Sequence, residues 1–165
     1  MSATNRGTVR NAQDFYATPK EAFDPMLPFI KRVAEVVQEP ACGDGRLVVW
    51  MNQYGIKAYG SDLNGGFDFL ADQRRHQTVV TNPPFSLAFE FCQHAVEHAD
   101  HVFLLLRLNF LASIKRREWF KLNEPDALFV LSERPSFTPD GKTDATDYAW
   151  YFWSNNPPFK GIFHL

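Results

Sequence analysis

Segments typical of strands alternate with segments typical of helices along most of this chain, and the alternation limits the folds open to it. Short apolar runs predict strands at residues 36–41, 56–63, 78–81, 101–106, 127–131 and 148–153. Longer runs with helical periodicity predict helices at residues 29–37, 44–54, 87–98 and 111–122. Strands joined through helices need crossover connections, so we expect a mainly parallel sheet with helices on both faces. The predicted fold class is an open α/β sandwich.

The two ends of this pattern are less regular than its middle. Residues 18–21, beginning with Thr18, are typical of a capping box, in which the threonine hydroxyl accepts from a helix amide. Pro25 and Pro28 interrupt the helix that would start there, so we expect a kink or two short helices. The last residues, 161–165, should form either an antiparallel partner for the sheet or a tail.

The length and charge of the chain restrict its organisation. A chain of 165 residues has the size of one domain, so we expect a single domain over residues 14–165, preceded by a flexible polar arm at residues 1–13. Seventeen Lys and Arg residues against nineteen Asp and Glu residues give a formal charge of -2, which excludes a global positive field for holding a polyanion. Any contact with nucleic acid must therefore be a local patch.

The cysteines and the apolar runs indicate in which part of the cell the protein is expected. Cys42 and Cys92 lie far apart without a CxxC partner, so the sequence predicts no metal site and no disulfide framework. The first ten residues lack the apolar centre of a secretory signal, and no apolar run approaches the length that spans a bilayer. We expect a cytoplasmic protein with no membrane partner, and the oligomeric state stays open.

Two predicted loops carry features of a nucleoside site. Ligands bind beyond the carboxyl ends of strands in such sheets, and Gly43 and Gly45 would let backbone amides approach one there, although a tight turn would use the same residues. Val48 stands where a dinucleotide motif needs a third glycine, which disfavours a pyrophosphate site. Asp62 follows Gly43 by nineteen positions, close to the spacing at which an acid meets ribose hydroxyls, although a solvated turn would look alike. Their conjunction favours a nucleoside-shaped ligand.

A third loop, Asn82-Pro83-Pro84-Phe85, directly follows a predicted strand. The two prolines fix the backbone and withhold two amide donors, so the loop presents carbonyl acceptors beside the Asn82 side chain. This arrangement suits an amino group that donates twice, such as the exocyclic nitrogen of adenine, held by Asn82 Oδ1 and the Pro83 carbonyl. Phe85 would offer a face on which a planar base stacks, a contact worth about 1–3 kcal/mol.

These motifs together resemble the S-adenosylmethionine-dependent amino-methyltransferases, in particular the phage-type DNA adenine methyltransferases. The resemblance runs from Asp14 to about Trp153, and the segment 14–19 is similar to the amino-terminal cofactor motif of that family. It implies a Rossmann-like methyltransferase sandwich with a mainly parallel sheet and a carboxyl-terminal antiparallel strand. It also implies direct methyl transfer to the N6 nitrogen of a flipped adenine, with S-adenosylmethionine as cofactor.

The resemblance also implies a role for individual residues. Catalytic roles fall on the loop Asn82, Pro83, Pro84 and Phe85. Cofactor-binding roles fall on Tyr16, Thr18, Glu39, Ala41, Gly43, Gly45, Asp62, Asp68 and Phe69. Asp72 competes with Asp68 for recognition of the cofactor adenine, and Thr18 would have to combine its contact with helix capping.

DNA is the partner that the resemblance implies, inside the host cytoplasm if a phage encodes the chain. Larger DNA methyltransferases add a target-recognition region, and no comparable segment follows the Asn82 loop here. Candidate DNA contacts, each of which is also explained as a solvated surface charge, are Arg6, Arg10, Arg107, Lys115, Arg116, Arg117 and Arg134. Residues 74–76 could likewise be either a DNA contact or a solvated surface charge. None of the five histidines has the spacing of metal ligands.

Three observations keep other functions open. A second Asn-Pro-Pro-Phe at residues 156–159 is followed by only six residues, which favours a carboxyl-terminal turn. An Asn-Pro-Pro loop can also hold an RNA base or the side-chain amide of a protein glutamine, although those families usually carry Tyr at the position of Phe85. The missing recognition region and the acidic charge also fit a non-catalytic module that binds the cofactor or DNA.

Overall fold

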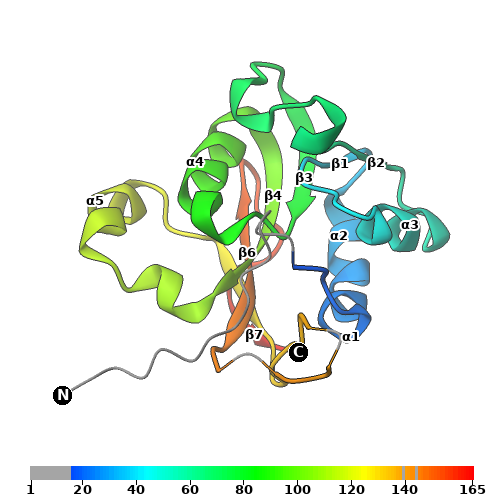
Figure 1. Ribbon diagram of the computed structural model, residues 1–165. Helices are drawn as coiled ribbons and strands as arrows, with labels where there is room; N and C mark the ends of the chain where they lie inside the picture. The colour runs from blue at the N-terminus through cyan, green and yellow to red at the C-terminus, as the bar shows by residue number, and fades with distance from the viewer. Residues whose placement is uncertain (1–15, 139, 144) are drawn as a thin grey trace.

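The computed structural model describes residues 16–138, 140–143 and 145–165. The expected arm at residues 1–13, the first two residues of the 14–19 motif, Arg6 and Arg10 all lie outside the described residues. The sheet has seven strands in the order β2-β1-β3-β4-β6-β5-β7 (Figure 1). Their bounds are β1 Val37–Glu39, β2 Ala58–Gly60, β3 His76–Thr81, β4 Ala99–Arg107, β5 Ala127–Val130, β6 Tyr148–Ser154 and β7 Gly161–His164.

The direction of the strands confirms the predicted fold class. Strands β2, β1, β3 and β4 are parallel neighbours, and β6 is antiparallel to both β4 and β5. The expectation that residues 161–165 form an antiparallel partner or a tail is wrong, because β7 pairs parallel with β5. The chain reverses after β6, but both sides of β6 are already occupied by β4 and β5. Strand β7 therefore lies on the outer side of β5, which runs in the same direction.

Helices cover both faces of the sheet, as the alternating pattern predicts (Figure 1). Helices α1, α2 and α3 lie on one face, and α4 and α5 lie on the other. Their bounds are α1 Lys20–Phe23, α2 Leu27–Val33, α3 Arg46–Gln53, α4 Ala88–His98 and α5 Ile114–Leu122. Short 3-10 turns are Asp24–Met26, Leu63–Gly65, Phe69–Ala71, Phe85–Leu87 and Leu108–Leu111. Within the described residues, no helix is both long and apolar enough to cross a membrane.

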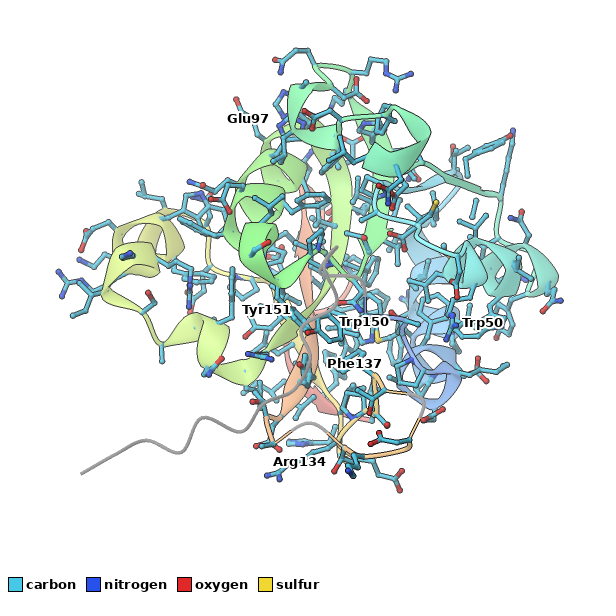
Figure 2. All side chains as sticks on the ribbon, in the orientation of Figure 1. Trp50, Glu97, Arg134, Phe137, Trp150 and Tyr151 are labelled. Atoms are coloured by element: carbon cyan, nitrogen blue, oxygen red, sulfur yellow. The ribbon has the colours of Figure 1, made fainter. Side chains whose placement is uncertain are left out.

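The core consists of two apolar clusters separated by the sheet, and β6 contributes to both. Trp150 and Phe152 belong to the cluster under α1, α2 and α3, whereas Tyr151 and Trp153 belong to the cluster under α4. Figure 2 shows Trp150 and Tyr151 at the centre of the molecule. The Trp150 Nε1 donates a hydrogen bond of 2.9 Å to the carbonyl of Ala22 in α1. Because both faces are covered, β6 is apolar at nearly every position.

The amino-terminal helices differ from the capping-box prediction. Helix α1 begins at Lys20 with Pro19 as its N-cap, and no side chain caps it. The Thr18 hydroxyl instead accepts a hydrogen bond from the side chain of Asn82, so the cap prediction is wrong. The two short helices expected from the prolines are present as α1 and α2. Helix α2 ends at Val33, where the Val33 carbonyl accepts from the Gln77 side chain.

Candidate active site

A cleft of about 1540 Å³ lies at the carboxyl ends of β1, β2, β3 and β4. Its lining includes most of the residues to which the sequence assigned a role: Tyr16, Thr18, Glu39, Ala41, Gly43, Asp62, Asp68, Phe69, Asn82, Pro83, Pro84 and Phe85. Gly45 is outside the lining and serves as the N-cap of α3. The topology thus brings together loops that are far apart in the sequence.

The glycine loop, residues 39–45, is held against the end of β2. The Cys42 amide donates to the Ser61 carbonyl at 3.0 Å, and the Ser61 amide donates to the Glu39 carbonyl at 2.9 Å. Gly43 and Gly45 have φ angles of 52° and 79°, in the left-handed region that side chains with a Cβ rarely adopt. The loop therefore turns within a few residues and leaves its backbone along the wall of the cleft.

The carboxylate of Asp62 connects the glycine loop to the turn after β2. Its Oδ2 accepts from the Gly43 amide at 3.1 Å, and its Oδ1 accepts from the Asn64 amide at 3.0 Å. An ionised carboxylate has about four acceptor positions, so these two bonds leave capacity for a hydroxyl ligand. Asp62 is therefore both a structural link and a polar group of the cleft.

The side-chain amide of Asn82 has one fixed orientation in the cleft. Its Nδ2 donates to the Tyr16 carbonyl at 3.0 Å and to the Thr18 hydroxyl at 3.1 Å. A carbonyl oxygen only accepts, so the nitrogen must face Tyr16 and the oxygen must point the other way. The Asn82 Oδ1 is buried and has no hydrogen-bond partner among the described residues. This oxygen is an acceptor in need of a donor.

Glu39 ends β1 at the bottom of the cleft and is 1% exposed. Burial raises the pKa of its carboxyl from 4.5 to about 8, against the smaller opposite effects of the Thr81 hydroxyl and the Ala41 amide. Its Oε2 has no hydrogen-bond partner among the described residues. The carboxyl is thus mostly protonated at neutral pH, and a cationic or hydrogen-bonding ligand would favour its ionised form.

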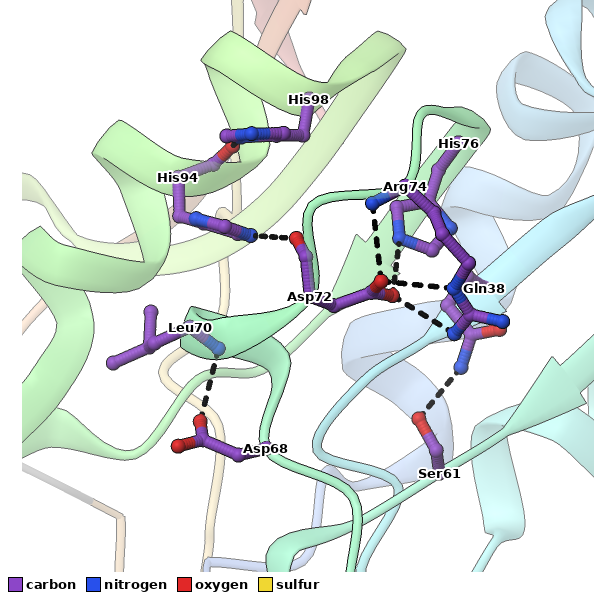
Figure 3. Close-up of polar contacts among 9 residues, drawn as sticks. All are labelled: Gln38, Ser61, Asp68, Leu70, Asp72, Arg74, His76, His94 and His98. Carbon is purple, nitrogen blue, oxygen red and sulfur yellow. Dashed lines mark hydrogen bonds and ion pairs between the residues drawn. The ribbon is translucent and has the colours of Figure 1, made fainter.

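Figure 3 distinguishes the two competing acids, Asp68 and Asp72. Asp68 caps a short 3-10 turn by accepting from the Leu70 amide at 3.0 Å, and it lines the cleft. Asp72 is outside the cleft lining and pairs with Arg74 and His76. The hydrogen bond from Arg74 holds the pKa of the Asp72 carboxyl well below its usual range. Asp72 is therefore an anchor of the fold.

Phe69 lines the cleft, but most of its ring is packed in the core. It is only 2% exposed, and its ring lies 5.3 Å from the ring of Phe91 and 4.8 Å from that of His94. Its half-buried neighbours Phe67 and Leu70 also line the cleft and offer apolar surface to a ligand. Sequence reasoning did not select them, because an isolated apolar residue in a turn has no diagnostic pattern.

Phe85 lies in an aromatic cluster at the other end of the cleft. Its ring centroid is 4.8 Å from that of Tyr16, 6.2 Å from that of Phe137 and 6.3 Å from that of Tyr148. The guanidinium carbon of Arg107 lies 4.7 Å from the same centroid. Phe137, labelled in Figure 2, comes from the long connection between β5 and β6 and was missed. A single Phe in a polar segment gave no signal of this contact.

Most of the remaining candidate cations are not in the cleft lining. Arg116 donates to the Phe110 carbonyl, and its guanidinium lies over the Phe110 ring. The ion pairs are Arg117 with Glu118, Arg134 with Asp147, Arg74 with Asp72, and Arg75 with Asp100. Lys115 is exposed on α5, also outside the lining. Arg107 differs from these residues, because it lines the cleft.

The second Asn-Pro-Pro-Phe is a turn between β6 and β7, remote from the cleft lining. Its Phe159 is 7% exposed and packs against Phe29, Phe129 and Phe152. In this second copy of the motif, the phenylalanine ring is therefore part of the core.

Cys42 and Cys92 are both free thiols. Among the described residues, no group of three or more His, Cys, Asp or Glu side chains is placed to hold a metal ion.

Fold and cleft together define a Rossmann-like α/β protein with a cleft at the carboxyl edge of its sheet, where ligands bind in such folds. No protein-family model matches the sequence, and no curated protein matches it. Among solved structures, the chain resembles a protein provisionally assigned as an RNA methyltransferase from Pyrococcus horikoshii, with 16% identity over 86% of this chain and 87% of that chain, at a TM-score of 0.65.

Two further solved structures support the same fold. One is provisionally assigned as a class I S-adenosylmethionine-dependent methyltransferase from Listeria monocytogenes, with 12% identity over 97% of this chain and 68% of that one, at a TM-score of 0.60. The other is a 23S ribosomal RNA methyltransferase, with 12% identity over 88% of this chain and 71% of that one, at a TM-score of 0.59. The chain has the fold of S-adenosylmethionine-dependent methyltransferases.

Proposed function

We propose that this protein transfers a methyl group from S-adenosylmethionine to the exocyclic amino nitrogen of adenine in a nucleic acid, with DNA as the expected substrate. The observation that carries the proposal is the Asn82 side chain. Its nitrogen is fixed by Tyr16 and Thr18, and its oxygen is buried in the cleft with no hydrogen-bond partner in the part of the chain that the structure describes. A donor such as an amino group is what this oxygen needs.

The other end of the cleft fits the cofactor. S-adenosylmethionine carries a sulfonium and an ammonium, and it supplies a methyl group that is activated for transfer. Glu39 has a buried oxygen that no described residue contacts by a hydrogen bond, and Asp62 and Asp68 present further acceptors in the same cleft. The turn at Gly43 and Gly45 leaves room for a ligand at the backbone. These residues would hold the positive charges and the ribose hydroxyls of the cofactor.

Catalysis in this proposal is mainly the placement of the amine. Asn82 Oδ1 and the Pro83 carbonyl would accept hydrogen bonds from its two hydrogens, so that the nitrogen lone pair would point at the methyl carbon. As the new bond from nitrogen to carbon formed, the bond from carbon to the sulfonium sulfur would break, the cofactor would leave as a neutral thioether, and the nitrogen would lose one proton to solvent. Phe85 supplies the stacking face, which offsets part of the cost of removing a base from a duplex. No protein nucleophile is required, since neither Cys42 nor Cys92 stands in a Pro-Cys loop after the strand that precedes residues 82–85, where a cytosine carbon-5 enzyme would place its nucleophile.

RNA is the second candidate substrate, and a specific observation favours it. Two of the similar solved structures are described as RNA methyltransferases, one of them acting on 23S ribosomal RNA. The resemblance in sequence favours DNA, since Phe85 replaces the Tyr that is usual in the RNA and protein enzymes. Both nucleic acids therefore belong in the same assay, together with a glutamine-containing protein substrate.

The decisive experiment compares two asparagines in identical tetrapeptides. Asn82→Ala should keep calorimetric binding of S-adenosylmethionine and lose transfer of a tritiated methyl group by about a hundredfold or more. Asn156→Ala, in the turn outside the cleft, should keep both. Mass spectrometry of nucleosides from the methylated product identifies the acceptor atom. Cofactor binding by the wild type without transfer to DNA, RNA or protein would instead support a non-catalytic module.

A further inference from the structure

Arg107 is held over the ring that the proposed function assigns to base stacking. It is the last residue of β4 and lines the cleft beside the proline loop. Its guanidinium carbon lies 4.7 Å from the Phe85 ring centroid and 6.0 Å from that of Tyr148. Its Nε donates a hydrogen bond of 3.1 Å to the Tyr148 hydroxyl. These contacts differ from those of a solvated surface cation.

A base that stacks on Phe85 competes with the side chains already around this ring. Tyr16 is the nearest aromatic neighbour, and its backbone carbonyl accepts a hydrogen bond that orients Asn82, so its main chain is anchored beside the ring. Phe137 meets the ring edge-on, at a centroid distance of 6.2 Å. Arg107 combines a stacking distance with a long flexible stem. Its departure from the ring would give up the bond to the Tyr148 hydroxyl but none of the bonds that orient the Asn82 amide.

We propose that Arg107 is a positioning residue for the nucleic-acid substrate: it covers Phe85 until a base enters, and then exchanges the ring for a backbone phosphate of the entering strand. The inference rests on the proposed function. A guanidinium binds phosphate through two parallel N–H bonds, which are stronger than its contact with a ring. The exchange would make phosphate binding a condition for opening the base site.

This exchange predicts that the contribution of the Arg107 side chain to substrate binding depends on the charge of the substrate backbone. With a phosphodiester, the displaced guanidinium gains a partner, so Arg107 favours binding. With a neutral methylphosphonate at the linkages flanking the target adenine, it gains none, so it opposes the entry of the base. A residue that only supports the fold would affect both substrates equally.

The test combines variants of the whole protein with two matched oligonucleotides. Arg107→Ala, Arg107→Lys and the control Arg32→Ala, whose guanidinium lies over the Phe159 ring outside the cleft, are assayed with both backbones. Binding is measured by fluorescence anisotropy over a range of salt concentrations with saturating S-adenosylmethionine, and transfer is measured as kcat/KM.

For the phosphodiester, Arg107→Ala should weaken binding and lower kcat/KM about tenfold, and the slope of log affinity against log salt should fall by about one. For the methylphosphonate, neither quantity should fall. Arg107→Lys should keep most of the salt slope, and Arg32→Ala should match the wild type on both backbones.

Equal losses of Arg107→Ala on both backbones, or an unchanged salt slope, would overturn the proposal. Failure of the proposed function would look different. The wild type would then transfer no methyl group to either oligonucleotide, while the anisotropy comparison would still report whether Arg107 contacts phosphate.

Discussion

At the scale of single residues, the site is defined by buried polar atoms that lack partners. Asn82 Oδ1 and Glu39 Oε2 are both buried in the cleft without a hydrogen bond from the described residues. Each unsatisfied group of this kind costs about 1–3 kcal/mol relative to a satisfied one. Such a cost is typical of a site that a ligand completes, because the ligand supplies the missing donor or charge.

Glu39 allows a prediction about stability and pH. Its pKa is about 8 in the folded protein and 4.5 in the reference state, so the unfolded chain ionises first as pH rises. The free energy of unfolding should therefore decrease between about pH 4.5 and pH 8, by at most about 5 kcal/mol. Glu39→Gln should remove this component and weaken cofactor binding. Urea unfolding of the wild type and of Glu39→Gln from pH 5 to pH 8 measures this difference. If the free energy of unfolding depended on pH in the same way for both proteins, the prediction would be wrong.

At the scale of elements, the turn between β1 and α3 forms the wall of the cleft that is proposed to bind the cofactor. Gly43 and Gly45 give this turn its shape through their positive φ angles. The Gly43 amide also donates a hydrogen bond to Asp62, which follows β2. Spacing in the sequence predicted that these two loops meet, because parallel strands place their carboxyl ends at one edge. The exact bounds were harder to predict: the helix expected at 29–37 ends at Val33, where contacts from Gln77 are non-local.

Gly43→Val should abolish detectable cofactor binding, because a β-branched residue is strained at φ 52° and its side chain would occupy the cleft. Gly141→Val is a matched control, since Gly141 has φ 71° in an exposed turn away from the cleft. Both variants should lose about 1–2 kcal/mol of stability from backbone strain. Calorimetric titration with S-adenosylmethionine separates them, and equal affinities would refute the role of the turn.

At the scale of the whole molecule, residues spread over the sequence meet in one cleft. The mainly parallel sheet and the convergence of the glycine loop, Asp62 and the proline loop at one edge of it followed from the sequence pattern, whereas the order of the strands did not. The contacts of Phe85 with Phe137 and Arg107 did not, because they depend on how β4 and the connection before β6 pack beside β3. The direction of β7 was missed for a similar reason, since it depends on which strand edges are already occupied.

Because the cleft exists only when these distant segments are folded together, its cofactor should stabilise the whole domain. At a concentration one hundred times its dissociation constant, a ligand that binds only the folded state adds about 2.7 kcal/mol. For a chain of this length that corresponds to a rise in Tm of about 5–10 °C. Differential scanning fluorimetry with S-adenosylmethionine should show this rise for the wild type and for Asn82→Ala, and a much smaller one for Gly43→Val. An equal rise with ATP, or none with S-adenosylmethionine, would show that the cleft holds another ligand.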